Sequence, residues 1–217
     1  MSLVARTLAE RVFEAVRERI VRGDFEGAAP LRQDALAAEL GVSKIPLREA
    51  LGRLEQEGLL VSQANRGYCV QPLSSAQAEE LFALRLAIEP HAAARAAAVA
   101  SRSERDQAER AWQALETAAS GDLSAVALRN REFHTALVRP GGRVLTTQLV
   151  ERLAILAERY VIAHLKPAGR DARAHLEHCG LVEAWLARDT LRVESLLAAH
   201  IQGTLNDLRA EFGPPPG

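Results

Sequence analysis

All six histidines of this 217-residue chain lie beyond residue 90, and three of them could bind a metal. His134, His178 and His200 each lie in a segment of helical periodicity with apolar neighbours. Uncharged imidazoles on the apolar faces of separate helices could converge on a buried polar site, and they are favoured ligands of zinc, nickel and related ions. Asn130, four residues before His134, shares its helix face. A single helical histidine is more often an ordinary hydrogen-bonded side chain, so the metal interpretation requires all three.

A second group of residues could bind DNA. Lys44 and Arg48 are four residues apart, which places both cations on one face of a helix. Ser43 is a suitable N-cap for that helix, and Pro46 falls in its first turn, where a missing N–H costs little. A helix that presents its N-terminal end and two cations is suited to the major groove, with the Ser43 hydroxyl and the helix N-terminus available to phosphate.

Segment 31–60 predicts the elements that would position these cations. Apolar residues mark a short first helix, Gly41 permits a sharp turn, and a second helix buries the face of Leu47, Leu51 and Leu54. Short strands are expected at 59–62 and 67–71, with turn residues between them. This order predicts a winged helix-turn-helix. The tip of its hairpin would contact DNA through Asn65, Arg66 and Gly67, and Arg32 is a weaker candidate.

The segment LAAELGVSKIPLREALGRLEQEGLL, residues 36–60, strongly resembles the GntR family of bacterial transcription regulators. The resemblance implies a sequence-specific DNA-binding protein. Lys44 stands where the family usually has arginine, so a phosphate-binding charge remains but the planar fork for bidentate guanine contact is lost.

Charge and composition limit the alternatives. The net charge is −1, and residues 1–72 hold ten Lys/Arg against ten Asp/Glu, so DNA binding depends on where the cations lie. Apolar runs are too short for a membrane helix, and the N-terminus lacks the features of a signal peptide. Cys69 and Cys179 are expected to be reduced thiols. These features predict a cytoplasmic protein that does not associate with membranes.

Two domains are expected, with a boundary in the Gln71–Ser74 segment. Residues 1–72 would form the winged helix-turn-helix, and residues 73–212 would form an all-α bundle that binds the effector and dimerises. About six helices are predicted near 75–100, 103–119, 122–138, 142–165, 170–188 and 189–211. The proline-rich end, 213–217, is expected to be disordered. The predicted fold class is therefore mainly α.

The bundle segment resembles the FCD domain, the effector-binding half of the FadR branch of the GntR family. The histidines of the family pattern fall on His134, His178 and His200, while Asn130 stands where the family has aspartate. The resemblance implies a metal site formed by these residues, in which Asn130 offers a carbonyl oxygen without charge. Zinc, nickel or manganese are the candidate metals. In FCD domains an arginine at the position of Arg85 often points into the ligand cavity, where its fork suits a carboxylate. From spacing alone, Arg85 could instead form an ordinary solvated pair with Glu89.

The resemblance implies a homodimeric regulator, most commonly a repressor, and not an enzyme. A small carboxylate metabolite in the bundle would change the affinity of two winged helices for a pseudo-palindromic operator. Three alternatives remain: a metalloenzyme that activates water, a winged helix that binds protein, and a metal-free regulator that binds acyl-CoA.

Overall fold

The computed structural model describes residues 7–25, 28–64, 66–119, 121–165, 167 and 169–213. Backbone contacts divide the chain into two compact units that meet between Leu73 and Ser74. None of the helices in the described ranges combines the length and the apolar character that a membrane crossing requires.

The N-terminal unit begins with α1, Leu8–Arg22, which a capping box starts. The Thr7 hydroxyl accepts a hydrogen bond from the Glu10 backbone N–H, and the Glu10 carboxylate accepts one from the Thr7 N–H. The helix ends at Gly23 with a φ of 87°, a left-handed conformation that favours glycine. The buried face of α1 packs against α3.

The helices α2 (Gln33–Glu39) and α3 (Lys44–Gln56) form the predicted helix-turn-helix. Gly41, in the turn, has a φ of 64°, so the turn requires the conformational freedom of glycine. Leu47, Leu51 and Leu54 of α3 are completely buried, as the apolar period predicted. Lys44 and Arg48 lie outside this buried face and are exposed.

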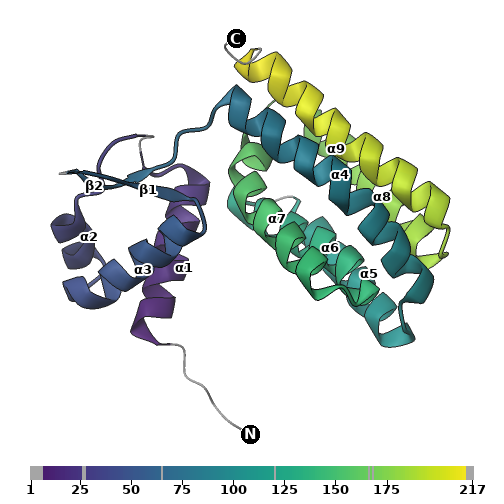
Figure 1. Ribbon diagram of the computed structural model, residues 1–217, viewed down its shortest axis with the longest axis horizontal. Helices are drawn as coiled ribbons and strands as arrows, with labels where there is room; N and C mark the ends of the chain where they lie inside the picture. Colours follow the sequence, from purple (N-terminus) through teal and green to yellow (C-terminus); the bar gives the residue numbers. More distant parts are fainter. Residues whose placement is uncertain are drawn as a thin grey trace, which may run out of the picture. The chain divides into compact units, whose positions relative to one another are not determined.

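The wing is an antiparallel hairpin of β1 (Leu60–Gln63) and β2 (Gly67–Val70). Leu60 pairs with Val70 and Ser62 with Tyr68. An isolated bridge between Pro30 and Cys69 joins the chain before α2 to the outer side of β2. The hairpin is therefore attached to the start of the helix-turn-helix as well as to its end (Figure 1).

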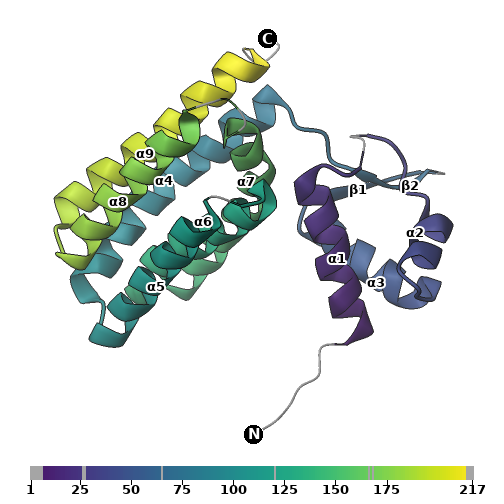
Figure 2. The same cartoon turned by 180° about the vertical axis from the view of Figure 1, so that it is seen from behind.

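The C-terminal unit consists of long helices and one short 3₁₀ turn (Figures 1 and 2). These are α4 (Ser75–Val99), α5 (Arg102–Ala118), α6 (Leu123–Val138), η1 (Arg139–Gly141), α7 (Val144–Leu165), α8 (Arg170–Leu186) and α9 (Thr190–Phe212). The Ser74 hydroxyl caps α4 by accepting a 3.1 Å hydrogen bond from the Gln77 N–H.

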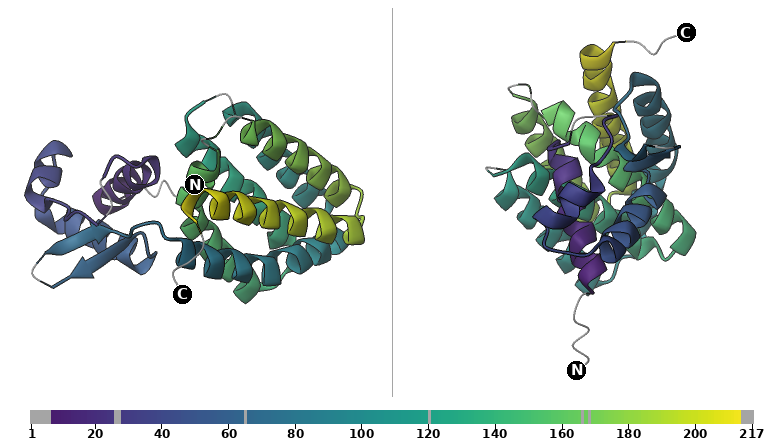
Figure 3. Two further views of the ribbon diagram at one scale, coloured as in Figure 1. Left: turned by 90° about the horizontal axis from the view of Figure 1, so that it is seen from above. Right: turned by 90° about the vertical axis from the view of Figure 1, so that its left-hand side faces the viewer.

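Small residues allow close packing around α4. Ala93, Ala96 and Ala97 are completely buried, and α4 packs most extensively against α9, which lies beside it (Figure 3). The fully buried Trp185 of α8 donates its indole N–H to the carbonyl oxygens of Ala93 and Leu137, at 3.2 and 3.0 Å. This side chain therefore links α8 to α4 and α6.

The predicted fold class is confirmed: a winged helix-turn-helix precedes an all-α bundle, with long helices where the sequence placed them. The turn η1 was not predicted, and it forms at Pro140, where the chain leaves α6. The expected disordered tail lies outside the described residues except for Gly213.

Candidate metal and effector site, and candidate DNA-binding surface

Three helices bring the predicted histidines together. His134 lies on α6, His178 on α8 and His200 on α9, and all three are buried. Each offers a ring nitrogen, and these three nitrogens lie within 4.8 Å of one another. The ring centroids of His178 and His200 are only 4.6 Å apart. The structure thus brings together the three histidines that the sequence was expected to bring together.

Some ring nitrogens of this cluster lack the partners that buried polar atoms ordinarily have. Both nitrogens of His134 and Nε2 of His178 are buried without a hydrogen bond among the described residues. Burial lowers the pKa of His134 to about 4, although Glu89 opposes that shift. Burial, and then the neighbouring His200, lowers the pKa of His178 well below 6.5. Neutral rings with free lone pairs at pH 7 fit a borderline transition-metal ion.

Two carboxylates lie behind the histidines. The Glu177 Oε2 atom is 2.7 Å from Nδ1 of His200, whereas the Glu89 Oε2 atom is 3.6 Å from Nδ1 of His134. Burial raises the pKa of Glu89, but Arg85 and His134 outweigh it and lower this pKa to about 2. Glu89 is therefore a buried anion. Neither carboxylate was predicted from the sequence to contact a histidine of the cluster.

Asn130 lies one helical turn before His134 on α6 and is also buried. It lines the same cavity as His178 and His200. Its position is thus compatible with the fourth-ligand role that the resemblance implied, through a neutral oxygen.

Arg85 is buried, with 3% of its surface exposed, and its side chain forms a close pair with Glu89. Its Nε and Nη2 atoms donate to the two Glu89 carboxylate oxygens at 2.6 and 3.1 Å. The pair suggested by the i, i+4 spacing exists, but the expectation that it would be solvated was wrong. The face of α4 that carries both residues turns toward the bundle interior, and Arg85 lines the cavity there.

The cavity beside the histidines has a volume of about 60 Å³. Its interior polar lining includes His164 and Thr204, both buried, while exposed Asp171 and half-exposed Glu116 lie nearer solvent. The rest of the wall combines His175 with mainly apolar side chains: Leu115, Ala119, Leu123, Val126, Val161, Leu165, Ala174 and Ile201. A small ligand with both a polar and an apolar part is compatible with this lining.

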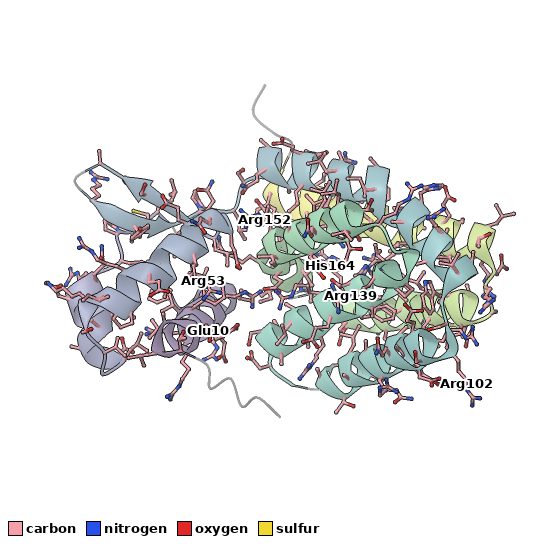
Figure 4. All side chains as sticks on the ribbon, turned by 60° about the horizontal axis from the view of Figure 1, so that its bottom comes forward. Glu10, Arg53, Arg102, Arg139, Arg152 and His164 are labelled. Carbon is pink, nitrogen blue, oxygen red and sulfur yellow. The ribbon has the colours of Figure 1, made fainter. Side chains whose placement is uncertain are left out.

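His164 is a cavity residue that sequence reasoning did not select. It lies near the end of α7 within the bundle (Figure 4), with Nδ1 3.1 Å from Oδ2 of Asp207 on α9. Burial lowers its pKa to about 4, and Asp207 acts in the opposite direction. No sequence spacing indicates this pair, because the two residues are 43 positions apart, on different helices.

The candidate DNA-binding cations gather at the start of α3. Exposed Arg32, Lys44 and Arg48 line one surface depression together with Gln33 and Asp34. The Lys44 Nζ atom lies 2.8 Å from Oδ1 of Asp34, an ion pair that the sequence did not indicate. This candidate DNA-binding surface therefore includes an acidic residue that is paired with Lys44.

The other candidate DNA contacts lie around the same helix start and in the wing. Ser43 is at the N-cap position, but its hydroxyl makes no capping hydrogen bond, and Pro46 is in the first turn as predicted. Arg66 is exposed beside the hairpin turn. Gly67 has a φ of 76°, and a Cβ added there would lie 3.1 Å from Gln33 Nε2. Asn65 lies outside the described residues.

Comparison with known proteins decides the family. Residues 8–70 match the gntR family of bacterial regulatory proteins, and residues 80–203 match the FCD domain. The chain belongs to the GntR family. This GntR protein is 30% identical to the HTH-type transcriptional regulator BphR of Paraburkholderia xenovorans, over 96% of this chain and 87% of BphR. It is also 30% identical to the transcriptional repressor GlaR of Escherichia coli, over 86% of this chain and 89% of GlaR.

A solved structure supports the same fold. Escherichia coli McbR/YncC superposes on this GntR protein with a TM-score of 0.79 at 22% identity, over 96% of this chain and all of that one. The domains and the relatives are those of DNA-binding transcription regulators and not of enzymes.

Proposed function

We propose that this regulator is a homodimeric repressor of the FadR subfamily, whose operator affinity is controlled by a small carboxylate bound, with a divalent metal, in the FCD domain. The observation that carries the proposal is the convergence of His134, His178 and His200, with buried nitrogens that lack partners. Relatives such as GlaR, a repressor, support the direction of regulation.

His134, His178 and His200 would hold the metal, with the Asn130 carbonyl oxygen as a fourth donor. When bound, zinc, nickel or manganese would supply a Lewis-acidic positive charge at the floor of the cavity. Burial lowers the pKa of His134 and of His178 and favours their neutral forms, and the Arg85 charge is offset by Glu89, so these protein residues give the floor little net positive charge. Recognition of a carboxylate is therefore expected to require the metal. Arg85 would contact the effector only through those guanidinium N–H groups that do not donate to Glu89.

The cavity volume limits the effector. The cavity volume of about 60 Å³ is small beside the roughly 300–1,000 Å³ common for ligand pockets. That space suits a short carboxylate and is far too small for an acyl-CoA. The metal-free acyl-CoA alternative is thereby disfavoured.

The winged helix would bind the operator through the start of α3. Arg48 and Lys44 would enter the major groove, Ser43 and the helix N-terminus would contact phosphate, and Arg66 would contact the backbone or minor groove. Arg32, Pro46, Asn65 and Gly67 complete the proposed surface. Two copies of the chain would place two such helices on the half-sites of a pseudo-palindrome.

The test combines metal analysis with DNA selection. We expect about one equivalent of a transition metal per chain in protein purified without an affinity tag, and its loss in His134→Ala. Duplexes selected from a random pool by the wild-type protein should be pseudo-palindromic. Absence of metal even after reconstitution would refute the metal-dependent part of the proposal, and absence of sequence selection would refute the operator part.

A further inference from the structure

Glu177 is the carboxylate most closely engaged with the histidine cluster. It lies on α8, directly before His178 in sequence, but its Oε2 atom reaches across to His200 on α9, 2.7 Å from Nδ1. At that distance His200 can donate its Nδ1–H to Glu177, which leaves the Nε2 lone pair free. A carboxylate behind a histidine in this way fixes the ring orientation and tautomer and raises the basicity of the other nitrogen.

Glu89 is in a different situation. Its Oε2 atom is 3.6 Å from Nδ1 of His134, beyond hydrogen-bonding distance, and both of its oxygens accept hydrogen bonds from Arg85. Its charge is therefore already balanced within α4. Glu177 is close to Arg173 at 3.4 Å, but Arg173 also pairs with Asp207. Of these two carboxylates, Glu177 has the shorter contact with a cluster imidazole and the less completely balanced charge.

A negative charge beside the cluster would matter because the oxygen donor proposed for the metal, the Asn130 amide, is neutral. Three neutral imidazoles and the Asn130 amide would surround a divalent cation without any negative ligand. A buried uncompensated charge is costly, and an acidic group hydrogen-bonded to a ligand lowers that cost without occupying a coordination position.

We propose that Glu177 is the positioning residue of the metal site: it holds the His200 ring with Nε2 toward the cluster and supplies the negative charge that Asn130 does not. The inference rests on the proposed metal site. A purely structural alternative is that Glu177 only joins α8 to α9. Because its side chain is 32% exposed, such a surface-edge contact would contribute little to stability.

Three variants distinguish the effect of the Glu177 charge from the effects of its hydrogen bond with His200 and of its contact between α8 and α9. Glu177→Gln keeps an acceptor for the Nδ1–H but removes the charge, and Glu177→Ala removes both. Glu183→Gln makes the same charge change on an exposed residue of the same helix, whose Oε1 atom lies 3.7 Å from the Cys179 Sγ atom. Zinc affinity is measured by competition with a chromophoric chelator at fixed pH, and unfolding of the metal-free protein is measured alongside.

We expect roughly 10- to 100-fold weaker zinc binding in Glu177→Gln, a larger loss in Glu177→Ala, and wild-type binding in Glu183→Gln. The unfolding midpoints of all the metal-free proteins should agree within a few degrees. Wild-type zinc affinity in Glu177→Gln would overturn the role of charge. If the variants lose zinc affinity only in proportion to the stability that they lose as metal-free proteins, the positioning role is overturned.

A fourth variant tests the link to Asn130. If Glu177 supplies the charge that Asn130 lacks, Asn130→Asp should restore most of the zinc affinity that Glu177→Gln loses. No restoration would overturn that link. Failure of the wild-type protein to bind zinc would refute the proposed metal site itself, which is a different result from normal zinc binding by Glu177→Gln.

Discussion

At the scale of single residues, the buried state of His134 predicts a pH dependence. Its pKa is about 4 in the folded protein against 6.5 when exposed, so below pH 6.5 the unfolded chain binds the proton more readily. The metal-free protein should therefore lose stability as pH falls from about 6.5 to about 4, by on the order of 3 kcal/mol from this residue. Urea unfolding of chelator-treated protein at pH 7 and pH 5 measures the loss. His134→Gln should show a smaller loss, and an equal one would contradict the assignment.

Arg48 is the cation that best tests the DNA-binding surface. It is exposed on α3, outside the face that carries the buried leucines. Arg48→Ala should abolish specific operator binding, with a loss of at least about tenfold since a base contact contributes roughly 1–3 kcal/mol, while the dimer stays intact. Arg53→Ala is the matched control, because Arg53 lies over the Phe13 ring at 4.4 Å and is directed toward α1. Gel-shift titration measures the operator affinity of both variants. Wild-type affinity of Arg48→Ala would refute the assignment of Arg48 as a DNA contact.

Asp34 should weaken DNA binding in the wild-type protein. Its carboxylate pairs with Lys44 at 2.8 Å and would lie near phosphate when α3 binds. Asp34→Asn should therefore tighten binding to random-sequence duplex and steepen the plot of log affinity against log salt by about one unit, because one more cation is free to displace counterions. Binding isotherms at several salt concentrations measure the slope. An unchanged slope would mean that Lys44 does not reach phosphate.

At the scale of elements, the sequence was most informative where local rules decide the structure. Gly41 marks a turn because glycine permits a positive φ, and Pro140 marks one because proline restricts φ. The apolar period of α3 identified its buried face. The histidines were found because they lie on apolar faces. The spacing indicated the Arg85–Glu89 pair, but the approach of Glu177 to His200 and of Glu89 to His134 was not found, because both contacts depend on how neighbouring helices are rotated. In α4, alanine surrounds much of the helix, so no apolar stripe reveals that Arg85 and Glu89 face inward.

The helices of the bundle depend on Trp185 for part of their packing. Its N–H bonds to carbonyl oxygens of α4 and α6, so Trp185→Phe loses both hydrogen bonds and leaves a small cavity. We expect a loss of roughly 2–4 kcal/mol in the free energy of unfolding, measured by urea denaturation. Trp112→Phe is the control, because the buried Nε1 atom of Trp112 has no hydrogen bond to lose. Equal losses would show that ring volume, and not the hydrogen bonds, determines the effect.

At the scale of the whole molecule, effector and operator must be thermodynamically linked if the proposed function is correct. A carboxylate that changes operator affinity by a given factor must have its own affinity changed by operator DNA by the same factor. In metal-loaded protein we expect a short carboxylate such as butyrate, which has a small apolar part, to weaken operator binding roughly 5- to 150-fold. Calorimetric titration of butyrate with and without selected operator duplex should give that same ratio.

His200→Ala provides the control for this linkage. The variant should bind the operator like the metal-free wild-type protein, since the winged helix is a separate compact unit, but should no longer respond to butyrate. Unequal factors in the two directions would show that butyrate acts outside the linked equilibrium, for example on dimerisation alone. A full response in His200→Ala would place the effector away from the histidine cluster. Matching factors in the wild-type protein, together with no response in the variant, would connect the buried histidines of the FCD domain to the cations of α3.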